Sequence, residues 1–235
     1  MPARQRVEVY QVYIDTQVLV DLADPDADRH RQAQALIRLF QRYQRPRQLR
    51  TLQLVTSAWA VAEAHGVLYQ NALERNGVAP PVRAGRVKKV RDTVPPFLTE
   101  LENAGRQVDT LLSSLQATTS FALLNDATPN ITQVWQLVGR IGREAAIYPA
   151  DSVHLALALQ TGCAMLVTDD ADFLDKIECC RDTLIQPYRA REFSYFPNLP
   201  PFQFCGLRES TSIIPGRPQR SRPAAIRTLN GLGFR

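Results

Sequence analysis

Acidic residues stand where apolar strand patterns end, and their types and spacing could support metal chemistry. Asp15 follows an apolar run at residues 7–14, and Asp151 opens the helical pattern that precedes a second apolar run at 164–168. That second run is followed by three acids in quick succession, Asp169, Asp170 and Asp172. Carboxylates that converge repel one another, and their usual partner is a divalent cation that prefers oxygen ligands. The sequence therefore indicates a site for Mg²⁺ or Mn²⁺.

Glu63 is a further candidate because it lies among apolar neighbours in a helical pattern at residues 58–75. A lone buried carboxylate costs free energy unless it has a partner, and a cation would be that partner. Other interpretations stay open for each acid. Asp15 and Asp151 could serve only as helix caps or N-terminal charges. Glu63 could face solvent, and the three acids after residue 168 cannot all be ligands.

Strand and helix patterns alternate along most of the chain, which predicts an α/β fold with a parallel sheet covered on both faces. In such sheets ligands bind at the carboxyl ends of the strands, where these acids stand. Ser57 is the expected N-cap of the helix at 58–75, and Gly162 the expected stop of the helix at 151–161. We expect strands at 7–14, 52–55, 120–124, 164–168 and 183–186, and helices at 16–23, 28–43, 58–75, 97–115, 129–143, 151–161 and 172–177.

Charge divides the chain into an acidic body and two basic segments. The net charge is +5, yet residues 75–91 hold six Lys or Arg and no acid, and residues 189–235 hold eight Arg and two Glu. We expect one domain at 1–188, with a basic, proline-bracketed insertion at 75–96. A basic, proline-rich and irregular extension at 189–235 is expected to follow. Basic segments on an acidic body favour contact with a polyanion such as RNA, although basic loops can also serve solubility alone.

Other features of the sequence narrow the class of protein. The four cysteines form no CxxC pair and predict reduced thiols. No apolar run approaches the roughly 20 residues of a membrane span, and no secretory pattern precedes the first strand, so a cytoplasmic location is expected. His65 and His154 are expected to pack or to support neighbouring ligands, because hard cations prefer oxygen. No nucleophile elbow and no phosphate-binding GxxxxGK[ST] loop is present.

Three stretches carry a resemblance to a known family, and they are YIDTQVLVDL, TSAWAVAEAHG and YPADSVHLALALQTGCAMLVTDDADF. Across roughly residues 7–186 the chain resembles the PIN-domain nucleases, in particular the VapC-like ribonucleases. The resemblance implies a Rossmann-like sheet and a divalent-metal endonuclease that acts on RNA. The acids that it implies as catalytic residues and metal ligands are Asp15, Glu63, Asp151 and Asp170, with Asp172 as a further ligand candidate. Thr16, Thr168 and Asp169 are implied to lie beside the metal ligands.

The chain also departs from the family pattern at two places. Gln17 stands where the family favours Ser or Asn, and the separation of Glu63 from Asp151 is longer than in compact VapC-like chains. The predicted function is a divalent-metal-dependent endoribonuclease. It would be either a toxin paired with an antitoxin protein or a stand-alone RNA-processing enzyme, and the resemblance implies a homodimer. The alternative is a non-catalytic RNA-binding or scaffold protein that keeps the PIN fold. A haloacid-dehalogenase-like phosphohydrolase is disfavoured because no Asp-x-Asp follows the first strand.

Overall fold

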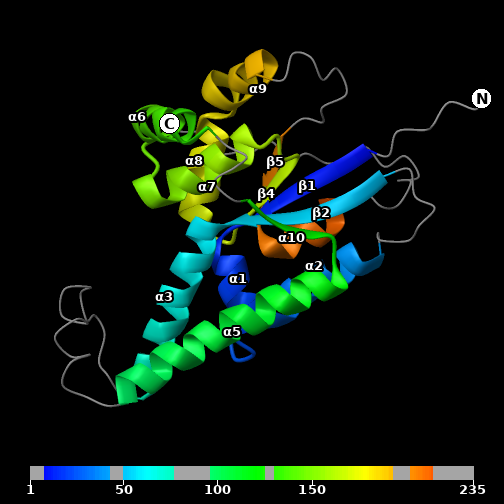
Figure 1. Cartoon of the computed structure of the whole chain (residues 1–235). Helices are drawn as coiled ribbons and strands as arrows, with labels where there is room; N and C mark the ends of the chain where they lie inside the picture. The colour runs from blue at the N-terminus through cyan, green and yellow to red at the C-terminus, as the bar shows by residue number, and fades with distance from the viewer. Residues whose placement is uncertain (1–7, 43–49, 77–95, 125–129, 193–201, 214–235) are drawn as a thin grey trace, which may run out of the picture.

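Five parallel strands form one sheet at the centre of the chain (Figure 1). A computed structural model describes residues 8–42, 50–76, 96–124, 130–192 and 202–213. The strand order is β3-β2-β1-β4-β5. The strands are β1 Glu8–Ile14, β2 Arg50–Ser57, β3 Phe121–Leu124, β4 Met165–Val167 and β5 Gln203–Cys205. This all-parallel sheet, flanked by helices, confirms the predicted α/β, Rossmann-like fold class.

Helices cover both faces of the sheet and define two hydrophobic cores. Successive side chains of β1 alternate between them, since Val12 and Ile14 belong to one core and Tyr13 to the other. The first core is closed by α1 Thr16–Ala23, α2 His30–Arg42, α3 Ala58–Arg75, α5 Pro96–Thr118 and α10 Leu207–Ile213. The second is closed by α6 Ile131–Ala145, α7 Pro149–Gln160, α8 Ala171–Cys179, the π-helix η1 Arg181–Ile185 and α9 Gln186–Glu192. Figure 1 shows these two groups of helices on opposite sides of the strands.

Short polar signals set the ends of several helices. Ser57 caps α3 by accepting a hydrogen bond from the Ala60 amide at 3.1 Å, which confirms its predicted role. Asn130 caps α6 in the same way, so this helix begins at Ile131. Gly162 follows α7 with a φ of 73°, a conformation that favours glycine, and it confirms the predicted stop.

The last part of the chain differs from the prediction. The strand expected at 183–186 is wrong, because these residues lie in η1 and at the start of α9, where Leu184, Ile185 and Tyr188 enter the second core at helical spacing. The fifth strand lies instead at Gln203–Cys205, inside the extension that was expected to be irregular. A strand of three residues leaves too little alternation to be recognised among prolines.

The same extension also contributes a helix. After β5, α10 packs against α2, and Leu207 is buried in the first core. Residues 77–95 of the basic insertion and 214–235 of the basic extension lie outside the described residues.

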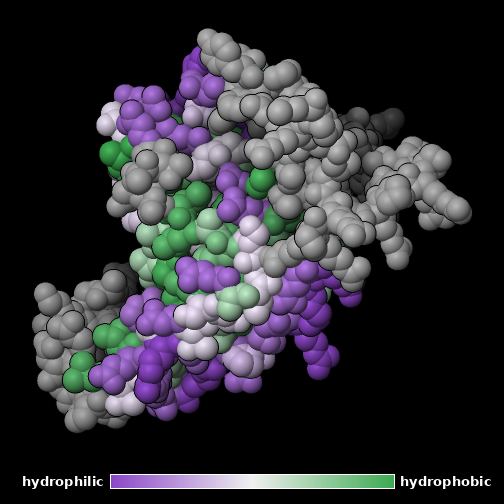
Figure 2. Space-filling view, turned by 45° about the vertical axis from the view of Figure 1, so that its right-hand side comes forward, coloured by the Kyte–Doolittle hydropathy of each residue, from purple (hydrophilic) through white to green (hydrophobic). Residues whose placement is uncertain are grey.

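The surface in view is uneven in polarity. Figure 2 shows hydrophilic side chains above and below an apolar area in the middle of the face. None of the helices in the described part of the chain is long and apolar enough to cross a membrane.

Candidate active site

Three of the predicted acids follow the carboxyl ends of neighbouring parallel strands, and the fourth lies at the start of a helix. Asp15 comes directly after β1 and caps α1, and Asp170 follows β4 and caps α8. Glu63 lies in the second turn of α3, the helix that starts where β2 ends. Asp151 lies in the first turn of α7, where the positive end of the helix dipole favours a carboxylate. The fold therefore directs all four toward one rim of the sheet.

Glu63 is held by two side chains from other elements. The Thr16 hydroxyl donates to Glu63 Oε2 at 2.6 Å, and His154 Nε2 lies 2.9 Å from the same oxygen. Burial alone would raise the pKa of Glu63, but the hydrogen bonds of His154 and Thr16, with a smaller one from Trp59, lower it below its usual range. Glu63 is therefore kept as a charged carboxylate.

A buried polar chain leads from Glu63 into the second core. His154 is buried on α7, and its Nδ1 lies 3.0 Å from the Tyr13 hydroxyl. The Tyr13 hydroxyl lies 2.8 Å from Ser57 Oγ, the cap of α3. Burial raises the pKa of Tyr13, so its phenol stays neutral and can only act as a hydrogen-bonding group. Buried polar groups need such partners, and here the chain of partners fixes the orientation of the imidazole toward Glu63.

Asp15 is buried, with 6% of its surface exposed. Its Oδ1 accepts from the Val18 amide at 3.1 Å. Burial raises its pKa to about 6, although His154 and the Thr168 hydroxyl act in the opposite direction. A positive charge beside Asp15 would therefore relieve an unfavourable buried anion.

Asp151 and Asp170 act on each other through their charges. The pKa of Asp151 is raised first by burial, then by the negative charge of Asp170, with a smaller contribution from Glu63. Asp170 is exposed and accepts from the Phe173 amide at 3.0 Å. The structure thus brings Asp151 within electrostatic reach of both Asp170 and Glu63, and His154, which contacts Glu63, also acts on the charge of Asp15.

The other two acids of the β4 loop have basic partners. Asp169 pairs with Arg29 at 2.5 Å and accepts from the Leu207 amide at 3.3 Å. Asp172 is exposed on α8 and pairs with Lys176 one turn later. Asp169 therefore joins the α2 end of the fold to α10, and Asp172 is engaged on the surface.

The donor chemistry of the four acids suits a hard cation such as Mg²⁺ or Mn²⁺, since all are carboxylates and Thr16 and Thr168 add hydroxyl oxygens beside them. The elevated pKa of buried Asp15 and the mutual repulsion at Asp151 also favour an added positive charge. As the side chains are placed, however, no three His, Cys, Asp or Glu residues of the described ranges stand together closely enough to hold a metal ion. Glu63 is instead engaged with Thr16 and His154.

Sequence reasoning gave little weight to three residues of this network. His154 was expected to pack or to support a neighbouring ligand; it contacts Glu63, and the structure adds its links to Tyr13 and Thr16. Its signal was the i,i+3 spacing from Asp151, which puts both side chains on one helix face. Trp59 stands four residues before Glu63 and carries the same kind of signal. Tyr13 had no signal, because an inward tyrosine on a strand looks like any core residue.

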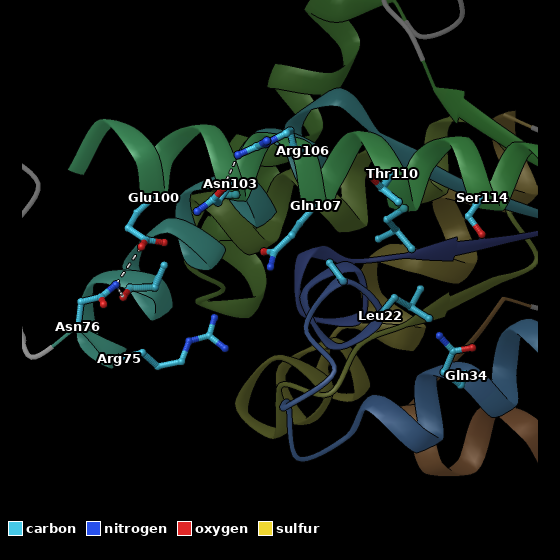
Figure 3. Close-up of a pocket in the computed structure, with 14 residues that line it drawn as sticks. Leu22, Gln34, Arg75, Asn76, Glu100, Asn103, Arg106, Gln107, Thr110 and Ser114 are labelled. Atoms are coloured by element: carbon cyan, nitrogen blue, oxygen red, sulfur yellow. Dashed lines mark hydrogen bonds between the residues drawn. The ribbon is translucent and has the colours of Figure 1, made fainter. Parts of the chain in front are cut away.

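A separate groove of about 660 Å³ opens between α3 and α5, with part of α1 and α2 (Figure 3). Its side chains are mostly polar, and Asn76 donates to Glu100 at 3.1 Å at one end. None of the predicted site residues lines it. The groove is therefore distinct from the edge of the sheet near Asp15, Glu63, Asp151 and Asp170, which we call the acidic rim.

Comparison with known proteins identifies the family of the chain. Residues 12–178 match the PIN domain family, and the chain belongs to that family. No curated protein matches the chain. Among solved structures it is similar to the Mycobacterium tuberculosis VapC20 toxin, which cleaves the sarcin–ricin loop. The identity is 14%, the match covers 70% of this chain and 93% of that one, and the TM-score is 0.39. A likeness of that size carries no conclusion about activity.

Proposed function

We propose that this protein is a divalent-metal-dependent endoribonuclease. The observation that carries the proposal is the position of Asp151 within electrostatic reach of both Asp170 and Glu63 in a PIN domain, where burial and then the two negative charges raise its pKa. Natural folds rarely gather carboxylates that destabilise one another unless a cation or a reaction needs them. The basic segments of an otherwise acidic chain support a polyanionic substrate.

In this proposal Asp15, Glu63, Asp151 and Asp170 hold Mg²⁺ or Mn²⁺, with Asp172 as a further candidate. A bound ion of this kind supplies charge neutralisation at the phosphate and a more acidic water for attack on phosphorus. Thr16 and His154 orient Glu63 and keep it charged. Thr168 hydrogen bonds to Asp15 and holds it at the end of β1.

The test is to incubate the purified full-length chain with a panel of RNAs in Mg²⁺, in Mn²⁺ and in chelator, and to map any cut ends. We expect metal-dependent internal cleavage that stops in chelator. Asp15→Asn keeps the helix cap but removes the charge, and it should abolish cleavage. Full cleavage by this variant, or cleavage in chelator, would overturn the metal-centre assignment.

A non-catalytic RNA-binding protein is the second candidate, and one observation favours it. The acids of the described ranges are not arranged to hold a metal ion as they stand, and Glu63 is committed to His154. Metal binding measured by calorimetry, together with RNA binding but no cleavage of any RNA in the panel, would select this candidate over the nuclease.

The motifs that resemble VapC-like ribonucleases support a toxin as the biological setting. A small antitoxin protein would then be the partner, and a homodimer the working form. Expression of the chain should arrest growth of its host cell, and co-expression of a small protein encoded beside it should relieve the arrest. Growth arrest that persists with Asp15→Asn would separate toxicity from cleavage and contradict this setting.

A further inference from the structure

The chain has two tryptophans, and both are exposed although the side chain is one that usually packs. Trp59 is 41% exposed at the start of α3, and Trp135 is 53% exposed on α6. A single exposed aromatic residue needs no explanation by itself. Trp59 is near the acidic rim and Trp135 is far from it. Trp59 is therefore a candidate for contact with a ligand of the rim, and Trp135 is its control.

Trp59 lies one turn before Glu63 on the same face of α3. Its side chain lies near enough to the Glu63 carboxylate to contribute to lowering the pKa of that group. The contact places the indole at the acidic rim, while a large part of its ring stays open to solvent. An open aromatic face therefore stands beside a candidate metal ligand.

Tyr148 provides a second open aromatic side chain, at the start of α7, the helix that carries Asp151. It is the N-cap residue of α7, three residues before Asp151, and it makes no side-chain capping bond. Its side chain is 70% exposed, although the adjacent Ile147 is buried. The Ser152 amide donates to its carbonyl at 2.9 Å, so the backbone that carries the ring is fixed. The ring serves neither the helix cap nor the core.

Trp135 lies toward the opposite end of the α6–α7 pair. Gln160, the last residue of α7, donates to Gln133 at 2.7 Å, which places the start of α6 beside the end of α7. Asp151 stands nine residues before Gln160, about 14 Å along the helix axis. Trp135 is thus an exposed tryptophan near the far end of the helix pair.

Aromatic side chains beside a phosphate-binding centre suit unpaired nucleotides. Bases of a single strand can turn outward and stack on Trp or Tyr, whereas bases in a duplex are already stacked and paired. Stacking tolerates any base, because each has an aromatic face. We propose, on the basis of the nuclease function above, that Trp59 and Tyr148 form a stacking platform that directs the acidic site to unpaired RNA.

Fluorescence of Trp59 tests the platform directly. In Trp135→Phe, Trp59 is the one remaining tryptophan, and in Trp59→Phe, Trp135 is. With Ca²⁺ in place of Mg²⁺, and with intact RNA verified on a gel, a single-stranded 12-mer should quench Trp59 strongly. The same strand in a duplex should quench it little, and neither should quench Trp135. Equal quenching of Trp59 by both RNAs, or by neither, would overturn the platform.

Binding and cleavage by substituted proteins separate stacking from support of Glu63. Trp59→Ala and Tyr148→Ala should each weaken single-strand binding roughly 10-fold. Trp59→Phe and Tyr148→Phe should stay within about 2-fold, because the ring remains. Trp135→Ala should change nothing. If Trp59→Phe weakens binding as much as Trp59→Ala, the residue acts through its bond to Glu63, and the platform is wrong.

The platform and the nuclease function can fail separately. If the wild type cleaves RNA in Mg²⁺ or Mn²⁺, and Trp59→Ala and Tyr148→Ala cleave loops and duplexes at the same rates as the wild type, the platform is wrong and the nuclease function is supported. If the wild type binds RNA with the expected quenching but cuts nothing, the nuclease falls and the platform stands. If it binds no RNA, both fall.

Discussion

Asp15 and Asp24 lie nine residues apart at the two ends of α1 and are almost equally buried, at 6% and 5% exposure. Asp24 accepts a charged hydrogen bond from Arg75 at 3.2 Å. Within the described part of the chain Asp15 has no ion pair, and its pKa rises to about 6. The two acids are thus alike in burial and differ in that Asp24 has a cationic partner in the chain. The charge of Asp24 is therefore balanced within the fold, whereas the burial of a charged Asp15 costs free energy of folding.

The same contrast repeats at the end of β4. Asp169 has Arg29 and a backbone amide of the last helix, whereas Asp170 adds its charge to that of Asp151. Neighbours in sequence thus fall into two classes, those with a partner in the chain and those without. Three of the predicted metal ligands, Asp15, Asp151 and Asp170, have no ion pair within the described residues, whereas Glu63 is engaged with His154 and Asp172 with Lys176. The predictions below test whether the acids without an ion pair are functional.

Asp170→Asn should produce a large loss of cleavage, comparable to that of Asp15→Asn. Asn can still accept the Phe173 amide, so α8 keeps its cap and the fold should keep its stability. The charge that a metal ion needs is removed, and cleavage should fall roughly 100-fold or more. Single-turnover cleavage rates in Mn²⁺, with circular dichroism as the fold control, check this. An unchanged rate would remove Asp170 from the site.

Asp15→Asn should stabilise the protein in chelator at neutral pH. Because the folded-state pKa lies above the unfolded value of roughly 3.9, the native state keeps its proton longer. Stability from this group is fully present below about pH 4 and is lost as pH rises to about 6. The deficit at pH 7 is about 3 kcal/mol, so Asn should raise Tm by roughly 6–12 °C.

Asp24→Asn is the matched control for that experiment, because Asp24 is equally buried and has Arg75 as a partner. This substitution should lower stability at pH 7 by about 1 kcal/mol. Thermal melts of both variants at pH 4.5 and pH 7.5 measure whether each substitution raises or lowers Tm. Destabilisation by both substitutions at pH 7.5 would show that Asp15 is a structural acid like Asp24.

Asp169→Asn should have a smaller effect, and on stability alone. The Arg29 ion pair is partly exposed and contributes about 1 kcal/mol, while Asn can still accept from Leu207. Urea unfolding should therefore shift slightly, and the cleavage rate should stay near that of the wild type. A loss of cleavage comparable to that of Asp170→Asn would place both neighbours in the same class.

Much of the fold was readable from sequence because its signals are long or chemically specific. Helix α3 with its Ser57 cap, and α7 with its Gly162 stop, were predicted from capping rules and periodicity. Strand β5 was not, since three residues at a sheet edge give no period, and what identifies them is their pairing with β4. The misread segment 183–186 is apolar but short, and short apolar runs do not distinguish strand from helix.

For the candidate site, sequence could indicate which acids stand at strand ends but not which of them are neutralised. The partner of Asp169 is Arg29, 140 residues away, and that of Asp24 is Arg75 on another helix. Such pairings depend on tertiary structure. The spacing of Asp151 and His154 was visible, yet the link of His154 to Glu63 and Tyr13 required the packing of α7 against β1 and α3.

The position of β5 also sharpens the prediction for the basic extension. Removing all of 189–235 would delete β5 and the Leu207 anchor of Asp169, so a loss of RNA binding would not be informative. Residues 214–235 carry five Arg and no acid, and they lie beyond the last described helix. Deleting only these residues leaves β5 and α10 in the chain.

The same deletion should weaken RNA binding modestly and flatten its salt dependence. Each phosphate that no longer binds an arginine reduces the slope of log K against log salt by about 0.7 for a single strand. Five arginines therefore set an upper limit of about 3.5 on the change in slope, and a change of about 1 to 3 is expected. Fluorescence anisotropy across a salt series measures it, with Asp170→Asn as the background so that RNA stays intact. An unchanged slope would mean that the acidic rim, with whatever cation it binds, holds RNA without help from this part of the chain.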